Sequence, residues 1–178
     1  MASTSDPAPD LDTGPDADPE SVARKILLDQ LTGRARTRSE LTTKLRQRGV
    51  PDDVGTRLLD RFEEVGLVDD AAFAREWVEQ RQSGRGLARR ALAQELRRKG
   101  VDDEVVRDTL DEVDPDDEVE AARMLVRAKL RTVRSLEHDK ATRRLVSMLA
   151  RKGHSPGVAY RVVNEELGAD LADPDLDS

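Results

Sequence analysis

Residues 69–101, DDAAFAREWVEQRQSGRGLARRALAQELRRKGV, contain the pattern that decides the fold. Apolar side chains recur in this stretch at three- and four-residue steps, first around Trp77 and then around Leu96, which is the spacing of one face of an α-helix. Residues 83–86 contain two glycines and are predicted to break the first helix, and Gly100 is predicted to end the second. The stretch is therefore predicted to form two amphipathic helices joined by a turn.

The end of this stretch repeats elsewhere in the chain. The motif L-x-x-[KR]-G ends at Gly49, Gly100 and Gly153, so that its copies are 51 and then 53 residues apart. An amphipathic segment precedes each copy and another follows it, and Thr37 with Glu40 three residues later is the pattern of a capping box that starts a helix. The predicted unit is therefore three helices, used three times.

The repeat predicts an all-α fold, because no stretch shows the sustained two-residue alternation of a half-buried strand. The predicted three-helix repeats comprise residues 21–66, 67–113 and 114–167. Since a unit of roughly 50 residues buries little surface on its own, we expect the repeats to stack. Residues 1–20 and 168–178 are acidic and poor in large apolar side chains, and we predict that they are disordered tails.

Charge alternates along the predicted repeats. The formal net charge of −7 comes from the two tails, which hold ten acidic residues, so the body between them is mildly basic. The net charge by segment is +6 for 21–49, −5 for 50–72, +5 for 82–100, −10 for 101–120 and +8 for 121–152. Helix-dipole complementation and salt bridges between neighbouring helices account for part of this pattern. Three basic clusters in register favour, beyond that, a surface that faces a polyanion.

Twelve basic residues in and around the predicted second helices are the candidates for this surface. Arginine outnumbers lysine by 24 to 6, and its planar guanidinium suits bidentate contacts with phosphate, although a GC-rich genome would produce the same bias. Contacts of this kind are salt-sensitive and weakly sequence-specific. The candidates for binding DNA or a DNA-protein filament are Arg85, Arg89, Arg90, Arg97, Arg98 and Lys99, with their repeat counterparts Arg46, Arg48, Arg143, Arg144, Arg151 and Lys152.

The sequence contains no pattern of catalytic, metal-binding or cofactor-binding residues. It has no cysteine, no glycine-rich phosphate loop and no HExxH motif. His138 and His154 are predicted to lie in loops, far apart and without ligand-like spacing. We therefore predict a protein that is not an enzyme. No apolar run is long enough to span a membrane and no signal pattern begins the chain, which predicts a cytoplasmic protein.

Trp77, the only tryptophan, has two interpretations. It is four residues after Phe73, so that both rings lie on one helix face, which is typical of a core residue. A platform on which bases stack needs an exposed ring with aromatic neighbours. Because aromatic residues are 2% of the chain, we favour the core interpretation.

The motifs of the central stretch resemble the signature of a known family. The pattern D-x-x-F-A-x-x-W-V-x-x-R-x-x-G from Asp70, followed by E-L-x-x-K-G-V from Glu95, is similar to the central repeat of the RecX regulatory proteins. E-L at Glu40 with L-x-x-R-G ending at Gly49 resembles the first repeat of that family, and the motif ending at Gly153 its third. The resemblance covers residues 22–167. His154 departs from it, because that position of the third repeat more often holds an apolar residue.

The resemblance implies an elongated, curved body and a bacterial modulator of the recombinase RecA. Family members bind the filament of RecA on single-stranded DNA, lie in its helical groove, and restrain its ATPase, strand-exchange and coprotease activities. The resemblance therefore implies a cytoplasmic monomer without cofactors, acting in DNA repair, DNA recombination and the SOS response. Its basic residues would face DNA, and its acidic helices would face basic patches on the recombinase.

A second reading from the residues is an autonomous DNA-binding protein, because three-helix units with a basic second helix also suit helix-turn-helix modules. In such a module the third helix reads DNA and should be basic, whereas residues 50–72 and 101–120 are acidic. A third reading is a passive helical scaffold, whose binding would respond little to salt.

Overall fold

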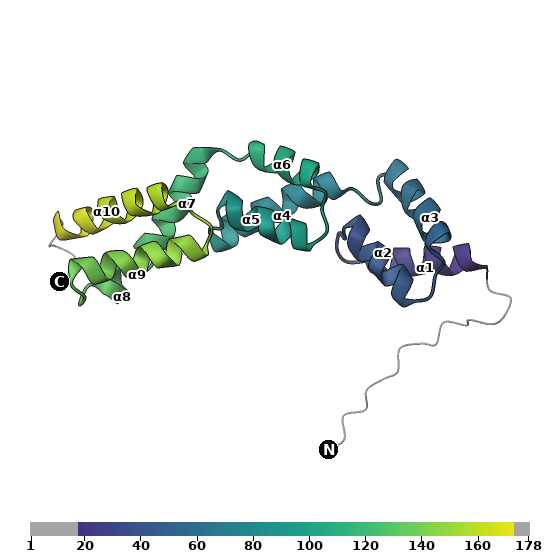
Figure 1. Cartoon of the computed structure of the whole chain (residues 1–178), viewed down its shortest axis with the longest axis horizontal. Coiled ribbons are helices and arrows are strands. Elements are labelled where there is room, and N and C mark those ends of the chain that lie inside the picture. Colours follow the sequence, from purple (N-terminus) through teal and green to yellow (C-terminus); the bar gives the residue numbers. More distant parts are fainter. Residues whose placement is uncertain (1–17, 173–178) are drawn as a thin grey trace, which may run out of the picture. The chain divides into compact units, whose positions relative to one another are not determined.

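The computed structural model describes residues 18–172, and the side chains of residues 18–170. Ten helices and no strand occur in this part of the chain (Figure 1), which confirms the all-α prediction. The described residues form two compact units, divided between Asp69 and Asp70. The remaining parts of the predicted tails, residues 1–17 and 173–178, lie outside the described residues.

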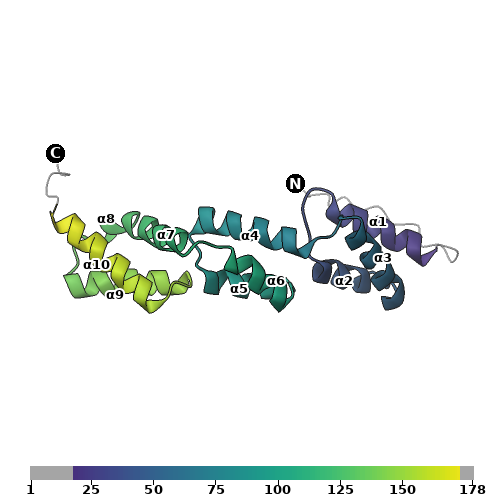
Figure 2. The same cartoon turned by 90° about the horizontal axis from the view of Figure 1, so that it is seen from above.

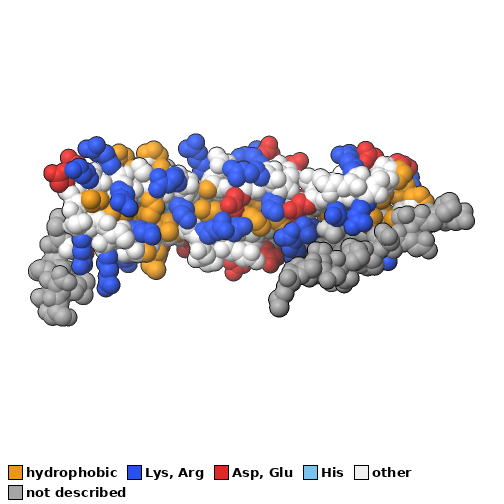
Figure 3. Space-filling view, turned by 90° about the horizontal axis from the view of Figure 1, so that it is seen from below, with side chains coloured by type: hydrophobic (Ala, Val, Ile, Leu, Met, Phe, Trp, Pro, Cys, Tyr) orange, Lys and Arg blue, Asp and Glu red, His pale blue; other side chains and the backbone are white. Residues whose placement is uncertain are grey.

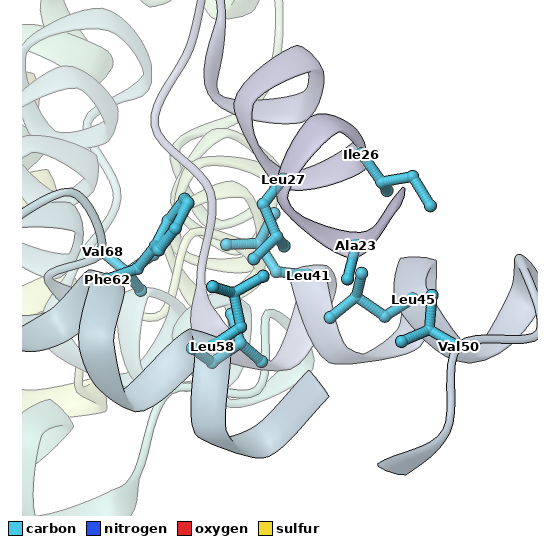
Figure 4. Packing of buried hydrophobic residues seen from close by; sticks show 10 residues of the cluster. Ala23, Ile26, Leu27, Leu41, Leu45, Val50, Leu58, Phe62 and Val68 are labelled. Carbon is cyan, nitrogen blue, oxygen red and sulfur yellow. The ribbon is translucent and has the colours of Figure 1, made fainter. Parts of the chain in front are cut away.

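The first unit consists of α1 (Pro19–Leu31), α2 (Arg38–Gln47) and α3 (Asp52–Glu64). Each helix turns an apolar stripe inward, and side chains from all three, among them Leu27 and Leu58, lie close together in the interior (Figure 4). The core of this unit consists of Ala23, Ile26, Leu27, Leu41, Leu45, Val50, Leu58, Leu59, Phe62 and Val68.

Side-chain caps set where the helices of the first unit begin. The predicted capping box is confirmed: the Glu40 backbone N–H donates to Thr37 Oγ1 at 3.2 Å, and the Thr37 N–H donates to Glu40 Oε2 at 3.2 Å. The Asp18 carboxylate caps α1, and Pro19 occupies its first turn. Residues 18–20 were predicted to belong to the disordered tail, but they form the start of α1.

The first half of the second unit consists of α4 (Asp70–Arg85), α5 (Arg89–Arg98) and α6 (Asp103–Asp111). The predicted break at residues 83–86 begins too early, since α4 continues to Arg85 and the chain turns at Gly86, which has a φ of +62°. A glycine inside a helix only weakens it, whereas a left-handed backbone ends it. The core consists of Phe73, Ala74, Val78, Leu87, Leu92, Leu96, Val101, Val106, Leu110 and Val113.

The second half of this unit consists of α7 (Pro115–Arg127), the short α8 (Leu130–Val133), α9 (His138–Arg151) and α10 (Pro156–Ala172). It therefore has one helix more than the predicted three, and α10 includes residues 168–172, which were predicted to belong to the tail. Figures 1 and 2 show α9 and α10 running side by side. The core consists of Ala122, Val126, Val133, Ala141, Leu145, Leu149, Ala159, Val162, Val163 and Leu167.

A buried carboxylate joins α7 to α10. Glu166 is 7% exposed, and its two oxygens accept from Arg127 Nε at 2.8 Å and from Arg123 at 3.1 Å. The hydrogen bonds from Arg127, and then from Arg123, lower the pKa of Glu166. These bonds satisfy a charge that would otherwise destabilise the interior.

The turns after α4 and α9 contact each other, and so connect the second and third repeats within one compact unit. The Ala88 N–H donates to the Lys152 carbonyl at 2.9 Å, and Lys152 Nζ donates to the Arg85 carbonyl at 3.2 Å. His154 Nε2 lies 3.0 Å from the Gly86 carbonyl. The predicted repeat boundaries, between residues 66 and 67 and between residues 113 and 114, stay a proposal. Val68, which was predicted to belong to the second repeat, packs in the core of the first unit.

Gly153 lets these two turns come together. Its φ is +89°, and a Cβ at this position would lie 2.6 Å from the Ala91 backbone nitrogen. Gly49, at the same position of the first repeat, has a φ of +74° and nothing within 4 Å of such a Cβ. Both positions favour glycine for its conformation, but only Gly153 also needs it for close packing.

We expect Gly153→Ala to destabilise the protein more than Gly49→Ala. The left-handed backbone costs each variant about 1–2 kcal/mol, and the contact with Ala91 adds about 1–3 kcal/mol to Gly153→Ala. Urea unfolding followed by far-UV circular dichroism measures both free energies. Equal losses would show that the two turns do not pack closely in solution.

Burial makes His154 a source of pH-dependent stability. The residue is 4% exposed, and this burial, with Lys152 nearby, lowers its pKa in spite of the Gly86 carbonyl and Glu118. The unfolded chain then takes up a proton below about pH 6.5 before the folded chain does, so the free energy of unfolding falls as the pH drops below that value.

Unfolding in urea between about pH 7 and pH 5 tests this dependence, in a range above the ordinary titration of carboxylates. His154→Leu should flatten the fall, whereas the control His138→Ala, at the exposed start of α9, should keep it. An unchanged slope in His154→Leu would assign the dependence to other groups.

Candidate nucleic-acid interface

The second helices α2, α5 and α9 present one apolar and one cationic side. Each buries two leucines four residues apart, such as Leu92 and Leu96 on α5, which are both 0% exposed. Because positions four apart share a helix face, the opposite face is open to solvent, and most of the cations lie there. Figure 3 shows lysine and arginine side chains gathered over α5 and α9 of the second unit, and others over α2 of the first.

Nine of the twelve predicted residues are exposed, and seven of these nine have no ion-pair partner among residues 18–170. The seven are Arg48, Arg85, Arg90, Arg98, Arg143, Arg144 and Arg151. An exposed guanidinium without a carboxylate partner loses no intramolecular bond when it binds an anion. These seven are the strongest candidates for contact with phosphate.

Two of the predicted residues are paired within their own repeats. Arg46 Nε lies 2.8 Å from Asp52 Oδ1, and Arg97 Nε lies 2.7 Å from Asp103 Oδ1, so each connects the end of a second helix to the start of the third. The hydrogen bond from Arg46 lowers the pKa of Asp52. Because both arginines stay more than half exposed, at 62% and 56%, these pairs contribute little to stability.

Arg89 braces the start of α5 against the start of α7. Its guanidinium donates to the Val113 carbonyl, its backbone N–H donates to Glu118 Oε2 at 3.2 Å, and its Nε lies 4.0 Å from the same carboxylate. Arg90, the next residue, is exposed and unpaired within residues 18–170. The structure therefore gives the two adjacent arginines different roles.

Lys99 and Lys152 are also engaged by the fold. Lys99 Nζ lies 5.1 Å from the centre of the Trp77 ring, and Lys152 donates to the Arg85 carbonyl. Both side chains are half-buried. Of the residues that precede the three repeat glycines, Arg48 is the exposed one.

Trp77 packs against the second core. Its ring stacks on Phe73 with centroids 5.6 Å apart, and the Arg81 guanidinium lies 4.2 Å from its centre. The indole N–H donates to Glu95 Oε2 at 2.8 Å, and Arg81 pairs with the same carboxylate at 3.1 Å. These contacts favour the core interpretation over a platform for bases.

A groove of different character lies between the end of α4 and α7. Its volume is about 480 Å³, and Met124, 59% exposed, lies in its apolar part. Three acidic residues line it, against one arginine. The lining residues are Glu79, Gln82, Ser83, Gly84, Arg85, Gly86, Asp117, Glu120, Ala121, Met124, Leu125 and Ala128.

The described residues contain no grouping of three or more histidine and acidic side chains that would hold a metal ion. His138 is the first residue of α9, not part of a loop as predicted, and His154 lies in a loop but is buried. None of the helices within residues 18–172 combines the length and apolar character that a membrane span requires.

Sequence reasoning missed Lys129, the residue just before α8, which lines a pocket together with Arg144 and Arg151 of α9. It was missed because the repeat alignment was read for the second helices alone. The net charge of +8 over residues 121–152 was the available signal.

Repeated three-helix arrangements whose second helices present cations define an all-helical repeat protein with a candidate polyanion-binding surface. Family models for the first, second and third three-helix domains of RecX match residues 23–62, 69–110 and 116–163. The chain belongs to the RecX family of regulatory proteins.

Relatives and solved structures agree with this assignment. The regulatory protein RecX of Thermobifida fusca is 51% identical over 168 residues, which are 93% of this chain and 91% of that protein. The one of Streptomyces coelicolor is 52% identical over 153 residues, or 86% and 81% of the two chains. The crystal structure of RecX from Lactobacillus salivarius shares the fold at a TM-score of 0.78 and 21% identity, covering 83% of this chain and 96% of that one. A crystal structure of a regulatory protein RecX matches at a TM-score of 0.74 and 25% identity, over 83% and 72%.

We expect Arg89→Ala to lower the free energy of unfolding by about 1–2 kcal/mol, because it leaves the Val113 carbonyl without its side-chain donor and removes the guanidinium near Glu118. Arg90→Ala, the matched control, should change it by less than about 0.5 kcal/mol. Urea unfolding followed by Trp77 fluorescence measures both in the unit that holds these residues. Equal effects would contradict the assignment of Arg89 as a brace.

Proposed function

We propose that this protein binds the filament that the RecA recombinase forms on single-stranded DNA and restrains its ATPase, strand-exchange and coprotease activities. In this proposal the protein acts as a cytoplasmic monomer, without cofactor or catalysis of its own. It serves in DNA repair, DNA recombination and the SOS response. Membership of the RecX regulatory family supports this role.

The observation that carries the proposal is the set of seven exposed arginines without ion-pair partners within residues 18–170. Arginine contacts the phosphates of DNA in two-point geometry and releases counterions when it does so. Because α5 has no aromatic residue and Trp77 of the neighbouring α4 packs against the core, the contacts of the α5 arginines are to the DNA backbone and carry little sequence information.

The groove between α4 and α7 supplies a second kind of surface. Its acidic residues Glu79, Asp117 and Glu120 surround an apolar floor, a combination that suits a basic, partly apolar surface of a protein. We assign this groove to a recombinase subunit and the arginines to DNA. A regulator of a nucleoprotein filament needs contacts with both the recombinase and the DNA, whereas a plain DNA binder needs only the contacts with DNA.

The alternative of an autonomous helix-turn-helix protein has less support. Its third helices would have to read DNA, but α3 begins with Asp52 and Asp53, and α6 with Asp103 and Glu104. Acidic side chains repel phosphate, so these helices do not suit the major groove.

A titration of RecA ATPase on single-stranded DNA tests the proposal. We expect this protein to lower the ATPase rate, and Arg90→Ala/Arg98→Ala to lose most of that effect. Two lost phosphate contacts should also reduce the slope of log affinity against log salt by about 1.4. The control Arg57→Ala/Arg107→Ala removes the same charge from exposed positions of the acidic helices α3 and α6 and should behave like the parent.

Binding to bare and to RecA-coated single-stranded DNA, measured by fluorescence anisotropy, completes the test. Tighter binding to coated DNA is expected. Equal affinities with no change in ATPase rate would favour the plain DNA binder, and no response of either affinity to salt would favour a passive scaffold.

A further inference from the structure

The third repeat contains a cationic pocket. The short helix α8 follows α7 directly and lies against α9, and together they enclose about 220 Å³. The described parts of the first two repeats have no helix at this place. The pocket is lined by Lys129, Thr132, Val133, Arg144, Leu145, Met148 and Arg151.

The pocket has three positive charges and no negative one in its lining. Lys129 is the residue just before α8, and Arg144 and Arg151, seven residues apart, lie on one face of α9. Within residues 18–170 none of the three has an ion-pair partner. Three cations held around one small cavity repel one another, so an anion between them lowers the energy of the folded protein.

In each of the first two repeats, an arginine at the end of the second helix is paired with the start of the next helix. Arg46 and Arg97 pair with Asp52 and Asp103, the first residues of the helices that follow. The third repeat has Ala150 at the aligned position, and α10 has no acidic residue in its first turn. The start of α10 therefore offers no carboxylate to Arg151 in the last turn of α9.

The wall of the pocket is held in place before any ligand binds. The Thr132 N–H and its Oγ1 both donate to the Lys129 carbonyl, at 2.9 Å and 2.7 Å. Val133 and Leu145, 3% and 1% exposed, anchor α8 and α9 to the core beneath. A preformed wall reduces the entropy lost when a ligand binds.

We propose that this pocket binds a phosphate group of the DNA backbone. Two guanidinium forks and one ammonium suit the oxygens of a phosphate, and 220 Å³ is smaller than the sites of about 300–1,000 Å³ that enclose whole small molecules. No aromatic side chain lines the pocket on which a base would stack. The assignment to DNA, and not to a free phosphate compound, rests on the proposed function.

Methionine methyl groups provide a direct readout on the intact chain, without recombinase. The chain has three methionines, of which Met148 lines the pocket and Met124 lines the α4–α7 groove. We expect a short thymidine oligonucleotide to shift the carbon-13 methyl signal of Met148 in NMR spectra while that of Met124 stays. In Arg144→Gln/Arg151→Gln the Met148 signal should no longer respond. An unresponsive Met148 in the parent, or a response that persists in the variant, would overturn the proposal.

The salt dependence of oligonucleotide binding gives a second test. Arg144→Gln/Arg151→Gln should reduce the slope of log affinity against log salt by about 1.4, the value for two phosphate contacts on a single strand. The control Arg131→Gln/Arg161→Gln removes equal charge from exposed positions of α8 and α10 outside the pocket lining, and should have a smaller effect. Equal reductions would mean a diffuse positive field instead of a site, and would overturn the proposal.

Pyrophosphate and ADP, titrated into the same sample, distinguish the source of the phosphate. We expect them to shift Met148 weakly and the oligonucleotide to displace them. If pyrophosphate and ADP lose affinity in Arg144→Gln/Arg151→Gln while the oligonucleotide binds that variant as tightly as the parent, the pocket belongs to free phosphate compounds. The DNA assignment then fails. If the protein does not lower the RecA ATPase rate but the oligonucleotide still shifts the Met148 signal, only the proposed function is refuted. If the protein lowers the ATPase rate but the Met148 signal does not respond, only the pocket assignment is refuted.

Discussion

The burial of two leucines, four residues apart, on each second helix is the constraint on which the rest of the structure depends. Leu92 and Leu96 are fully buried in the second core, as Leu145 and Leu149 are in the third. Removing such side chains from water contributes about 1.5–3 kcal/mol each. Since these positions take one side of a short helix, every other residue on it must tolerate solvent, and arginine and lysine do so at little cost.

A cation on the solvent-facing side of a second helix is not necessarily free to bind a partner. Ion pairs to the next helix occupy Arg46 and Arg97, a carbonyl and a carboxylate hold Arg89, and Lys99 lies over Trp77. What remains for a partner is the set of exposed arginines without carboxylate neighbours. Some arginines of this chain thus stabilise its turns and others form an exposed surface. Which of the two an arginine does depends on whether a carboxylate or carbonyl lies within reach of its guanidinium.

The third repeat departs from the other two at both ends of its second helix. The extra turn α8 precedes α9, and α10 follows it without the aspartate that neutralises Arg46 or Arg97. At the C-terminal end of α9, Gly153 and His154 pack on the turn after α4. Repeats two and three are therefore one compact unit, and the third repeat contains a pocket whose lining is purely cationic and neutral.

The sequence by itself determined the helices, the capping box at Thr37, the repeated glycine turns and the face of each second helix that carries cations. These features depend on neighbours within about four residues, so periodicity and spacing report them directly. Only the tertiary structure decided that Arg89 and Lys152 are engaged, because their partners are remote: Arg89 meets Val113, 24 residues away, and Lys152 meets Arg85, 67 residues away. Contacts over such separations arise when cores pack and turns meet, and no local pattern in the chain specifies them.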